Sequence, residues 1–64
     1  MNNFKKLRSQ AKLTQEELAG LLKVERSTVA MWEIGRALPR ADKLPSLAKI
    51  LNCSIDEILK EKEL

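Results

Sequence analysis

Apolar residues recur along the chain at intervals of three and four positions, the spacing that places them on one face of a helix. Phe4, Leu7 and Ala11 make the first stripe, which predicts a helix over about residues 3–11. A second stripe consists of Leu18, Ala19, Leu21 and Leu22. No segment shows the alternation of a strand, so the pattern indicates several short helices packed on a shared core.

A capping box marks the start of the second helix. The Thr14 hydroxyl can accept a hydrogen bond from the first helical turn, and the Glu17 carboxylate can accept one from the Thr14 N–H. Only residues 22–25 separate this helix from the next, so the chain reverses at once and the two helices must cross steeply. The spacing predicts a helix-turn-helix unit over about residues 14–34.

The third helix is predicted over about residues 26–34, with Glu25 as its N-cap and Gly35 at the left-handed position that follows it. Val29 and Trp32 are in phase to pack inward onto the second helix. The face that then points outward consists of Arg26, Ser27, Ala30 and Met31.

Two further helices follow a proline-containing loop. The fourth is predicted to start near residues 40–42 and to run to Leu51. Asp42 is its expected N-cap, because Pro45 is tolerated only in a first helical turn. Asn52 can adopt a left-handed conformation and stop this helix.

Ser54 and Glu57 repeat the capping-box spacing and open a short fifth helix that ends at Leu59. Residues 60–64 are expected to fray as an acidic tail, which leaves residues 1–59 as the folded domain. The predicted fold is therefore all-α, a single compact domain of five short helices.

The composition argues against several kinds of site. Cys53 is the only cysteine and the chain has no histidine, so no disulfide can form within it and a metal site is nearly excluded. The sequence contains no Ser-His or Cys-His arrangement and no glycine-rich phosphate loop. We therefore expect no enzyme activity, no cofactor and no small-molecule ligand.

The net charge of +3 is distributed unevenly along the 64 residues. Residues 1–55 carry a net charge of +5 and residues 56–64 carry −2. The basic part favours a polyanionic partner, and the acidic end is expected to face away from it. Apolar runs are too short for a membrane span or a signal peptide, so we expect a cytoplasmic protein.

Several segments together form a recognisable pattern. They are residues 14–19 (TQEELA), 26–29 (RSTV), 32–33 (WE), Gly35, 39–45 (PRADKLP), 47–51 (LAKIL) and 54–58 (SIDEI). In this order and spacing they resemble the lambda-repressor/Cro-like (Xre-type) helix-turn-helix family, over essentially the whole chain. The resemblance implies a compact five-helix DNA-binding domain that places its third helix in the major groove of duplex DNA.

The resemblance also implies roles for individual residues. The positions that usually lie at base edges are Arg26, Ser27, Thr28, Ala30 and Met31. The positions that usually contact phosphates are Gln15, Arg36 and Arg40. A further pair, Arg8 and Glu33, matches positions that often bridge the first and third helices.

The chemistry of these side chains supports the roles unevenly. Arg26 is the strongest candidate, because its planar fork can donate to both O6 and N7 of guanine. Ser27 and Thr28 discriminate poorly alone and can instead satisfy first-turn N–H groups. Met31 stands where relatives commonly have a polar residue. It can make only apolar contacts, either with a thymine methyl group or with other protein side chains. Lys23 stands where many relatives have glycine, so a positive φ there would cost about 1 kcal/mol.

One short helix covers few base pairs, so a homodimer that reads two half-sites is expected. Candidate dimer contacts are Ile55, Ile58 and Leu59. The resemblance implies a bacterial or phage-encoded repressor of a pseudo-palindromic operator, because small members of this family without a separate activating or sensing domain are usually repressors. The alternative is a DNA-binding antitoxin-like or anti-repressor partner that acts mainly through protein–protein contact, and obligate co-purification with another protein would favour it.

Overall fold

The computed structural model describes residues 3–59 and confirms the all-α prediction for them. The α-helices are α1 (Phe4–Gln10), α2 (Gln15–Leu22), α3 (Arg26–Glu33), α4 (Leu44–Leu51) and α5 (Ile55–Leu59), and a 3₁₀ helix, η1 (Ala41–Lys43), leads into α4. The predicted frayed tail, residues 60–64, lies outside the described residues.

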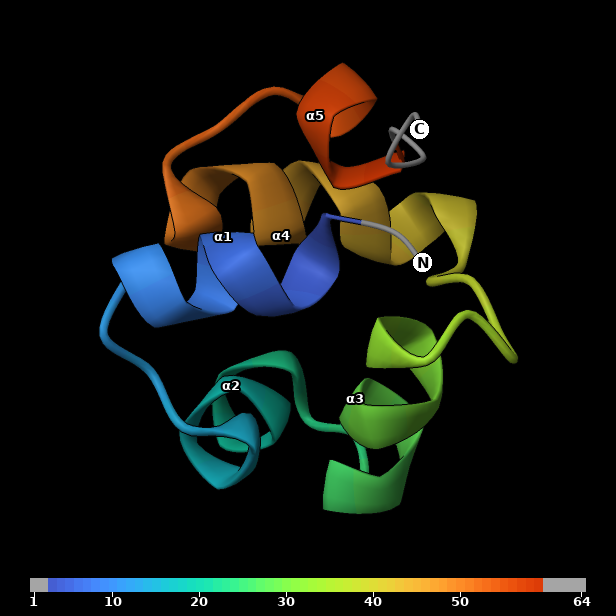
Figure 1. Cartoon of the computed structure of the whole chain (residues 1–64). Helices are drawn as coiled ribbons and strands as arrows, with labels where there is room; N and C mark the ends of the chain where they lie inside the picture. The colour runs from blue at the N-terminus through green and yellow to red at the C-terminus, as the bar shows by residue number, and fades with distance from the viewer. Residues whose placement is uncertain (1–2, 60–64) are drawn as a thin grey trace.

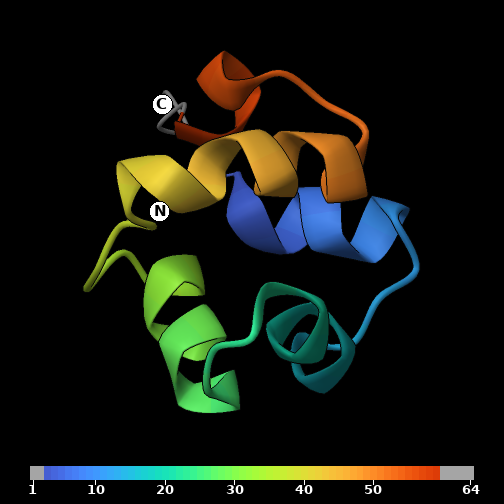
Figure 2. The same ribbon diagram turned by 180° about the vertical axis from the view of Figure 1, so that it is seen from behind.

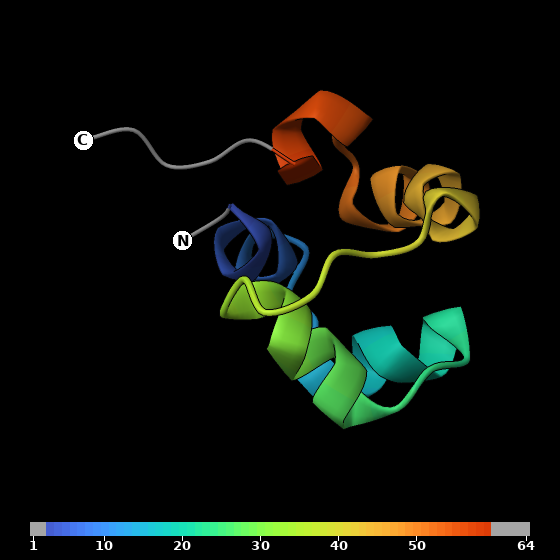
Figure 3. The same ribbon diagram turned by 90° about the vertical axis from the view of Figure 1, so that its right-hand side faces the viewer.

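The helix-turn-helix unit of α2 and α3 occupies one side of the domain (Figure 1). On the other side α1 and α4 run side by side, and both are seen end-on in Figure 3. α5 lies over α1 and α4, and α1 also contacts α3. Figure 2, seen from behind, shows the loop after α3 connecting the helix-turn-helix unit to η1 and α4.

The core draws residues from every α-helix, as the apolar stripes predict. It consists of Phe4, Leu7, Leu18, Ala19, Leu22, Val29, Trp32, Leu47, Leu51 and Ile58. The rings of Phe4 and Trp32 lie 5.4 Å apart at 51°, a tilted arrangement typical of attractive aromatic pairs. Because Trp32 packs on α1 rather than facing outward, its predicted core role is confirmed.

One predicted core position is wrong. Leu21 is 58% exposed, although it was expected to belong to the stripe of α2. The buried residues Leu18, Ala19 and Leu22 centre that stripe on one side of the helix, and Leu21 falls roughly 100° away from the centre.

The first four α-helices all end in the same way, with a residue in the left-handed region. These residues are Lys12 (φ 60°), Lys23 (φ 59°), Gly35 (φ 80°) and Asn52 (φ 54°). After α2, the N–H of Val24 donates to Ala19 O at 3.0 Å and the N–H of Lys23 to Gly20 O at 3.3 Å, the bond pair of a Schellman motif. Left-handed positions at Lys23, Gly35 and Asn52 follow from the sequence, whereas that of Lys12 does not.

Both predicted capping boxes are present. The N–H of Glu17 donates to Thr14 Oγ1 at 3.0 Å, and the N–H of Thr14 donates to Glu17 Oε1 at 2.9 Å. At α5 the N–H of Glu57 donates to Ser54 Oγ at 3.1 Å, and the N–H of Ser54 to Glu57 Oε1 at 3.4 Å. These boxes fix where α2 and α5 begin.

The predicted N-cap of α4 is wrong. Asp42 lies inside η1, and Lys43 is the N-cap of α4. The difference arises because a tighter 3₁₀ turn, closed by the N–H of Lys43 donating to Arg40 O at 2.9 Å, precedes the α-helix. Pro45 lies in the first turn of α4, as predicted.

Replacing Lys23 by glycine should raise the free energy of unfolding by about 1 kcal/mol, because glycine adopts φ 59° without the Cβ clash. Urea denaturation of the two proteins measures the difference. The matched control is Lys6→Gly, the same chemical change at an exposed position inside α1, which should lower stability by about 1 kcal/mol. Equal effects of the two substitutions would contradict strain at Lys23.

Candidate nucleic-acid interface

α3 divides into a core face and an outward face. Val29, Trp32 and Glu33 are buried against the rest of the domain. The predicted base-contacting residues lie elsewhere on the helix: Arg26, Ser27 and Met31 are exposed, and Thr28 and Ala30 are half-buried at its margins. The outward face is therefore a short strip of polar and apolar side chains, with one cation, Arg26, at its start.

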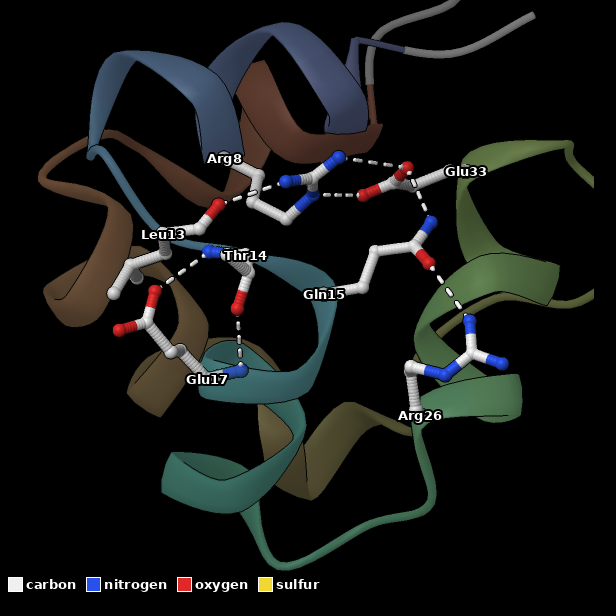
Figure 4. Close-up of polar contacts among 7 residues, drawn as sticks. All are labelled: Arg8, Leu13, Thr14, Gln15, Glu17, Arg26 and Glu33. Atoms are coloured by element: carbon white, nitrogen blue, oxygen red, sulfur yellow. Dashed lines mark hydrogen bonds and ion pairs between the residues drawn. The ribbon is translucent and has the colours of Figure 1, made fainter.

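Gln15 and Arg26, the first residues of α2 and α3, are brought together. The Arg26 guanidinium Nη1 donates to Gln15 Oε1 at 3.4 Å (Figure 4). One predicted phosphate contact and the main predicted base reader therefore lie side by side at the ends of two helices.

Behind them lies a buried ion pair, which confirms the predicted bridge between α1 and α3. Arg8 Nε donates to Glu33 Oε2 and Arg8 Nη2 to Glu33 Oε1, the latter at 3.3 Å. The side chains of Arg8 and Glu33 are only 13% and 6% exposed. The fork-to-carboxylate geometry gives this pair a fixed orientation.

The same carboxylate holds Gln15. Gln15 Nε2 donates to Glu33 Oε1 at 3.0 Å, and Arg8 Nη1 also donates to Leu13 O at 2.7 Å (Figure 4). A continuous polar cluster thus joins α1, the α1–α2 linker, α2 and α3. The place of Gln15 in this cluster could not be predicted from the sequence, since no spacing rule relates Gln15 to a carboxylate eighteen positions away.

The predicted phosphate contacts on the far side of α3 lie in and near the loop to η1. Arg36 and Arg40 are both exposed. Arg40 also borders a hollow of about 270 Å³, whose other lining residues are Val24, Thr28, Trp32, Ala37, Leu38 and Lys43. Lys43 Nζ donates to Leu22 O at 3.0 Å, so it closes the end of α2 and ties the helix-turn-helix unit to η1.

The predicted dimer contacts on α5 separate into two kinds. Ile55 and Leu59 are 36% and 41% exposed. Ile58 is 1% exposed and belongs to the core, so its assignment as a dimer contact is wrong. α5 is so short that Ile58, at the centre of its apolar stripe, is needed to cover the core, and only Ile55 and Leu59 remain at the surface.

Cys53 shows no sign of a reactive thiol. Burial raises its pKa above the ordinary 9.0, and the neighbouring Glu57 carboxylate raises it further. The thiol is therefore protonated near neutral pH, which agrees with the predicted role of a small apolar residue beside the core.

Two short helices, α2 and α3, joined by a tight turn form a helix-turn-helix unit, and the outward face of α3 starts at an arginine. Residues 4–58 match the family described as helix-turn-helix. The chain belongs to this Xre-type, lambda-repressor-like family of DNA-binding transcription regulators.

Two curated relatives extend the match. The chain is 38% identical to the HTH-type transcriptional activator BcrR of Enterococcus faecalis over 61 residues. The aligned segment covers 95% of this chain and 30% of that protein. It is also 38% identical over 58 residues to the uncharacterized HTH-type transcriptional regulator YqaE of Bacillus subtilis (strain 168). That alignment covers 91% of this chain and 50% of YqaE. The chain thus spans half or less of the length of these relatives.

Within residues 3–59 no helix is long and apolar enough to cross a membrane.

Proposed function

We propose that this chain binds duplex DNA sequence-specifically, with α3 lying in the major groove. The observation that carries the proposal is the outward face of α3. Arg26, Ser27 and Met31 are exposed there, whereas the opposite face of the helix is buried in the core. Arg26 reads a guanine through O6 and N7, and Met31 contacts a thymine methyl. Ser27, Thr28 and Ala30 add weaker contacts along the same groove.

Phosphate contacts on both sides of α3 hold it in register. Arg36 and Arg40 neutralise phosphates beyond the end of α3, where both side chains are exposed. Gln15 contacts a phosphate at the start of α2, where the helix N-terminus adds a favourable dipole. A side-chain amide carries two N–H hydrogens, so Gln15 keeps one for this contact after donating to Glu33.

Salt should weaken this binding steeply. With Arg36 and Arg40 contributed by each of two copies, about four phosphates are neutralised, and log K should fall with log salt at a slope of about −3.6. Fluorescence anisotropy with a labelled duplex at several salt concentrations measures the slope. Arg36→Ala should make it shallower by about 1.8, whereas Lys49→Ala, a matched loss of charge on α4, should leave it unchanged. A flat dependence would sink the proposal.

We further propose that the chain acts as a homodimer on a pseudo-palindromic operator. One α3 touches only a few base pairs, and two copies related by a twofold axis double that number on successive major grooves. Ile55 and Leu59 on α5 are the candidate contacts, since both are apolar and exposed beside the core.

Replacing Leu59 by lysine should shift the protein from dimer to monomer, because a charge cannot be buried unpaired at an apolar contact. Sedimentation velocity at several protein concentrations measures the shift. Leu21→Lys is the matched control: Leu21 is more exposed, at 58%, but lies on α2 and should leave the dimer intact. A dimer that survives Leu59→Lys, or a wild-type monomer, would rule out this contact.

Repression is the proposed outcome of binding. A domain that occupies a promoter can block polymerase by that occupancy alone, whereas activation also requires a favourable contact with polymerase. The name of BcrR indicates that a relative with a similar domain activates. A promoter–reporter assay with the selected operator distinguishes the two, and increased expression would show activation.

A further inference from the structure

The polar cluster behind the recognition helix carries an inference that rests on, and deepens, the proposed function. We propose that Glu33 is a positioning residue for base recognition. It fixes the amide of Gln15 with its oxygen toward Arg26, and thereby sets how strongly Arg26 discriminates between base pairs.

The first step follows from amide chemistry. A glutamine amide has a donating end and an accepting end, whereas an ionised carboxylate can only accept. Gln15 Nε2 lies 3.0 Å from Glu33 Oε1, so the amide must place its nitrogen there. The oxygen is then the end that faces Arg26, and it accepts from Arg26 Nη1 at 3.4 Å (Figure 4).

The second step concerns what holds Glu33 itself. Its carboxylate is 6% exposed and accepts two hydrogen bonds from Arg8, whose remaining terminal nitrogen donates to Leu13 O at 2.7 Å. The carboxylate is therefore anchored on two other segments of the fold and cannot turn to follow Gln15. The buried end of the cluster is rigid, and the exposed end is the guanidinium of Arg26.

The third step is the consequence for binding. An exposed arginine samples many rotamers, and the part of that freedom lost on binding weakens the contact. An acceptor that already holds one side of the guanidinium restricts those rotamers and leaves other N–H groups of Arg26 directed away from Gln15. Gln15 therefore serves both the phosphate and Arg26, and Glu33 acts on DNA without touching it.

The test separates positioning from phosphate contact. A duplex is first selected with the wild-type protein, and the base pair read by Arg26 is located as the one whose discrimination Arg26→Ala abolishes. Gln15→Met removes both the bond to Glu33 and the bond to Arg26. It should reduce the ratio of Kd values at that base pair by about 3- to 10-fold and leave the ratios at other base pairs unchanged. Gln10→Met, at an exposed glutamine of α1, should leave the ratios of Kd values unchanged at every base pair.

Loss of the phosphate contact alone would weaken binding to all duplexes equally. If Gln15→Met raises the Kd of every duplex by the same factor, so that the ratios of Kd values do not change, the positioning role is overturned.

A second variant tests Glu33 directly while preserving the fold. Arg8→Met/Glu33→Leu exchanges the buried ion pair for apolar side chains, a change that small domains often tolerate. If it folds, as helicity by circular dichroism reports, it should show the same loss of discrimination as Gln15→Met, and retained discrimination would overturn the proposal. If it does not fold, Glu33→Gln is measured instead, because its neutral amide removes the ionised acceptor that orients Gln15, and full discrimination in that variant would overturn the proposal. A wild-type protein without any base preference would overturn the proposed function and this inference together, whereas a preference that Gln15→Met leaves intact overturns only the inference.

Discussion

Replacing Glu33 by alanine should leave the protein only marginally stable at 25 °C, with a large unfolded fraction. The substitution leaves the guanidinium of Arg8, 13% exposed, without its carboxylate, and it leaves the Gln15 amide without an acceptor. Removing one partner of a buried pair costs about 3–5 kcal/mol. A domain of this size typically has a total stability of about 3–5 kcal/mol, so the loss consumes most of it. Far-ultraviolet circular dichroism and urea denaturation measure the change.

Two controls give this result its meaning. Glu16→Ala removes an exposed carboxylate from α2 and should change stability by no more than about 0.5 kcal/mol. Arg8→Met/Glu33→Leu should be markedly more stable than Glu33→Ala, because no buried charge is left unpaired. If Glu33→Ala melts like Glu16→Ala, the ion pair contributes little to the stability of the fold.

Replacing Arg26 by alanine should lower affinity for the selected duplex by about 1–3 kcal/mol while leaving non-specific binding nearly unchanged. The difference arises because a bidentate contact to guanine exists only at the correct base pair, whereas phosphate contacts exist everywhere. Titrations of the selected duplex and of an unrelated duplex at the same salt concentration separate the two terms.

Lys49→Ala is the matched control for this prediction, since it removes one positive charge from an exposed position on α4. Lys49→Ala should change neither the affinity for the selected duplex nor that for the unrelated duplex appreciably. If Arg26→Ala weakens both duplexes equally, Arg26 contacts the backbone and the base-reading strip is misplaced on α3. If helicity and melting change instead, Arg26 has a structural role.

The features that sequence predicted well are those governed by local physics. A capping box depends on residues three positions apart, so Thr14 and Glu17 were sufficient to place the start of α2. The positive φ of Lys23 was expected only because the family pattern has glycine there. Lys12 adopts nearly the same φ without such a pattern, and its side chain gives no signal of its own.

The features that sequence missed depend on neighbours distant in the chain. Ile58 and Leu59 are both apolar, and only the packing of α5 on α1 and α4 determines that Ile58 enters the core while Leu59 stays exposed. Likewise, Gln15 meets Glu33 because the steep reversal after α2 returns α3 to the start of α2. A tertiary contact of this kind follows from the arrangement of three helices, which no local rule contains.

This arrangement connects the fold to the proposed function. The Schellman turn at Lys23 and the bond from Lys43 to Leu22 fix the end of α2, and the cluster around Glu33 fixes its start against α3. The two helices therefore form a rigid unit whose exposed strip can meet a groove without rearrangement. Rigid presentation matters because base-edge contacts are short and directional.

The most direct measurement is the selection of bound duplexes from a random pool by the purified chain, followed by sequencing. We expect enrichment of a pseudo-palindrome whose half-site centres lie about one helical turn (10–10.5 base pairs), or a multiple of it, apart. Each half-site should contain a guanine whose enrichment disappears in Arg26→Ala. A pool that stays random, or an enriched sequence that Arg26→Ala selects equally well, would contradict this expectation.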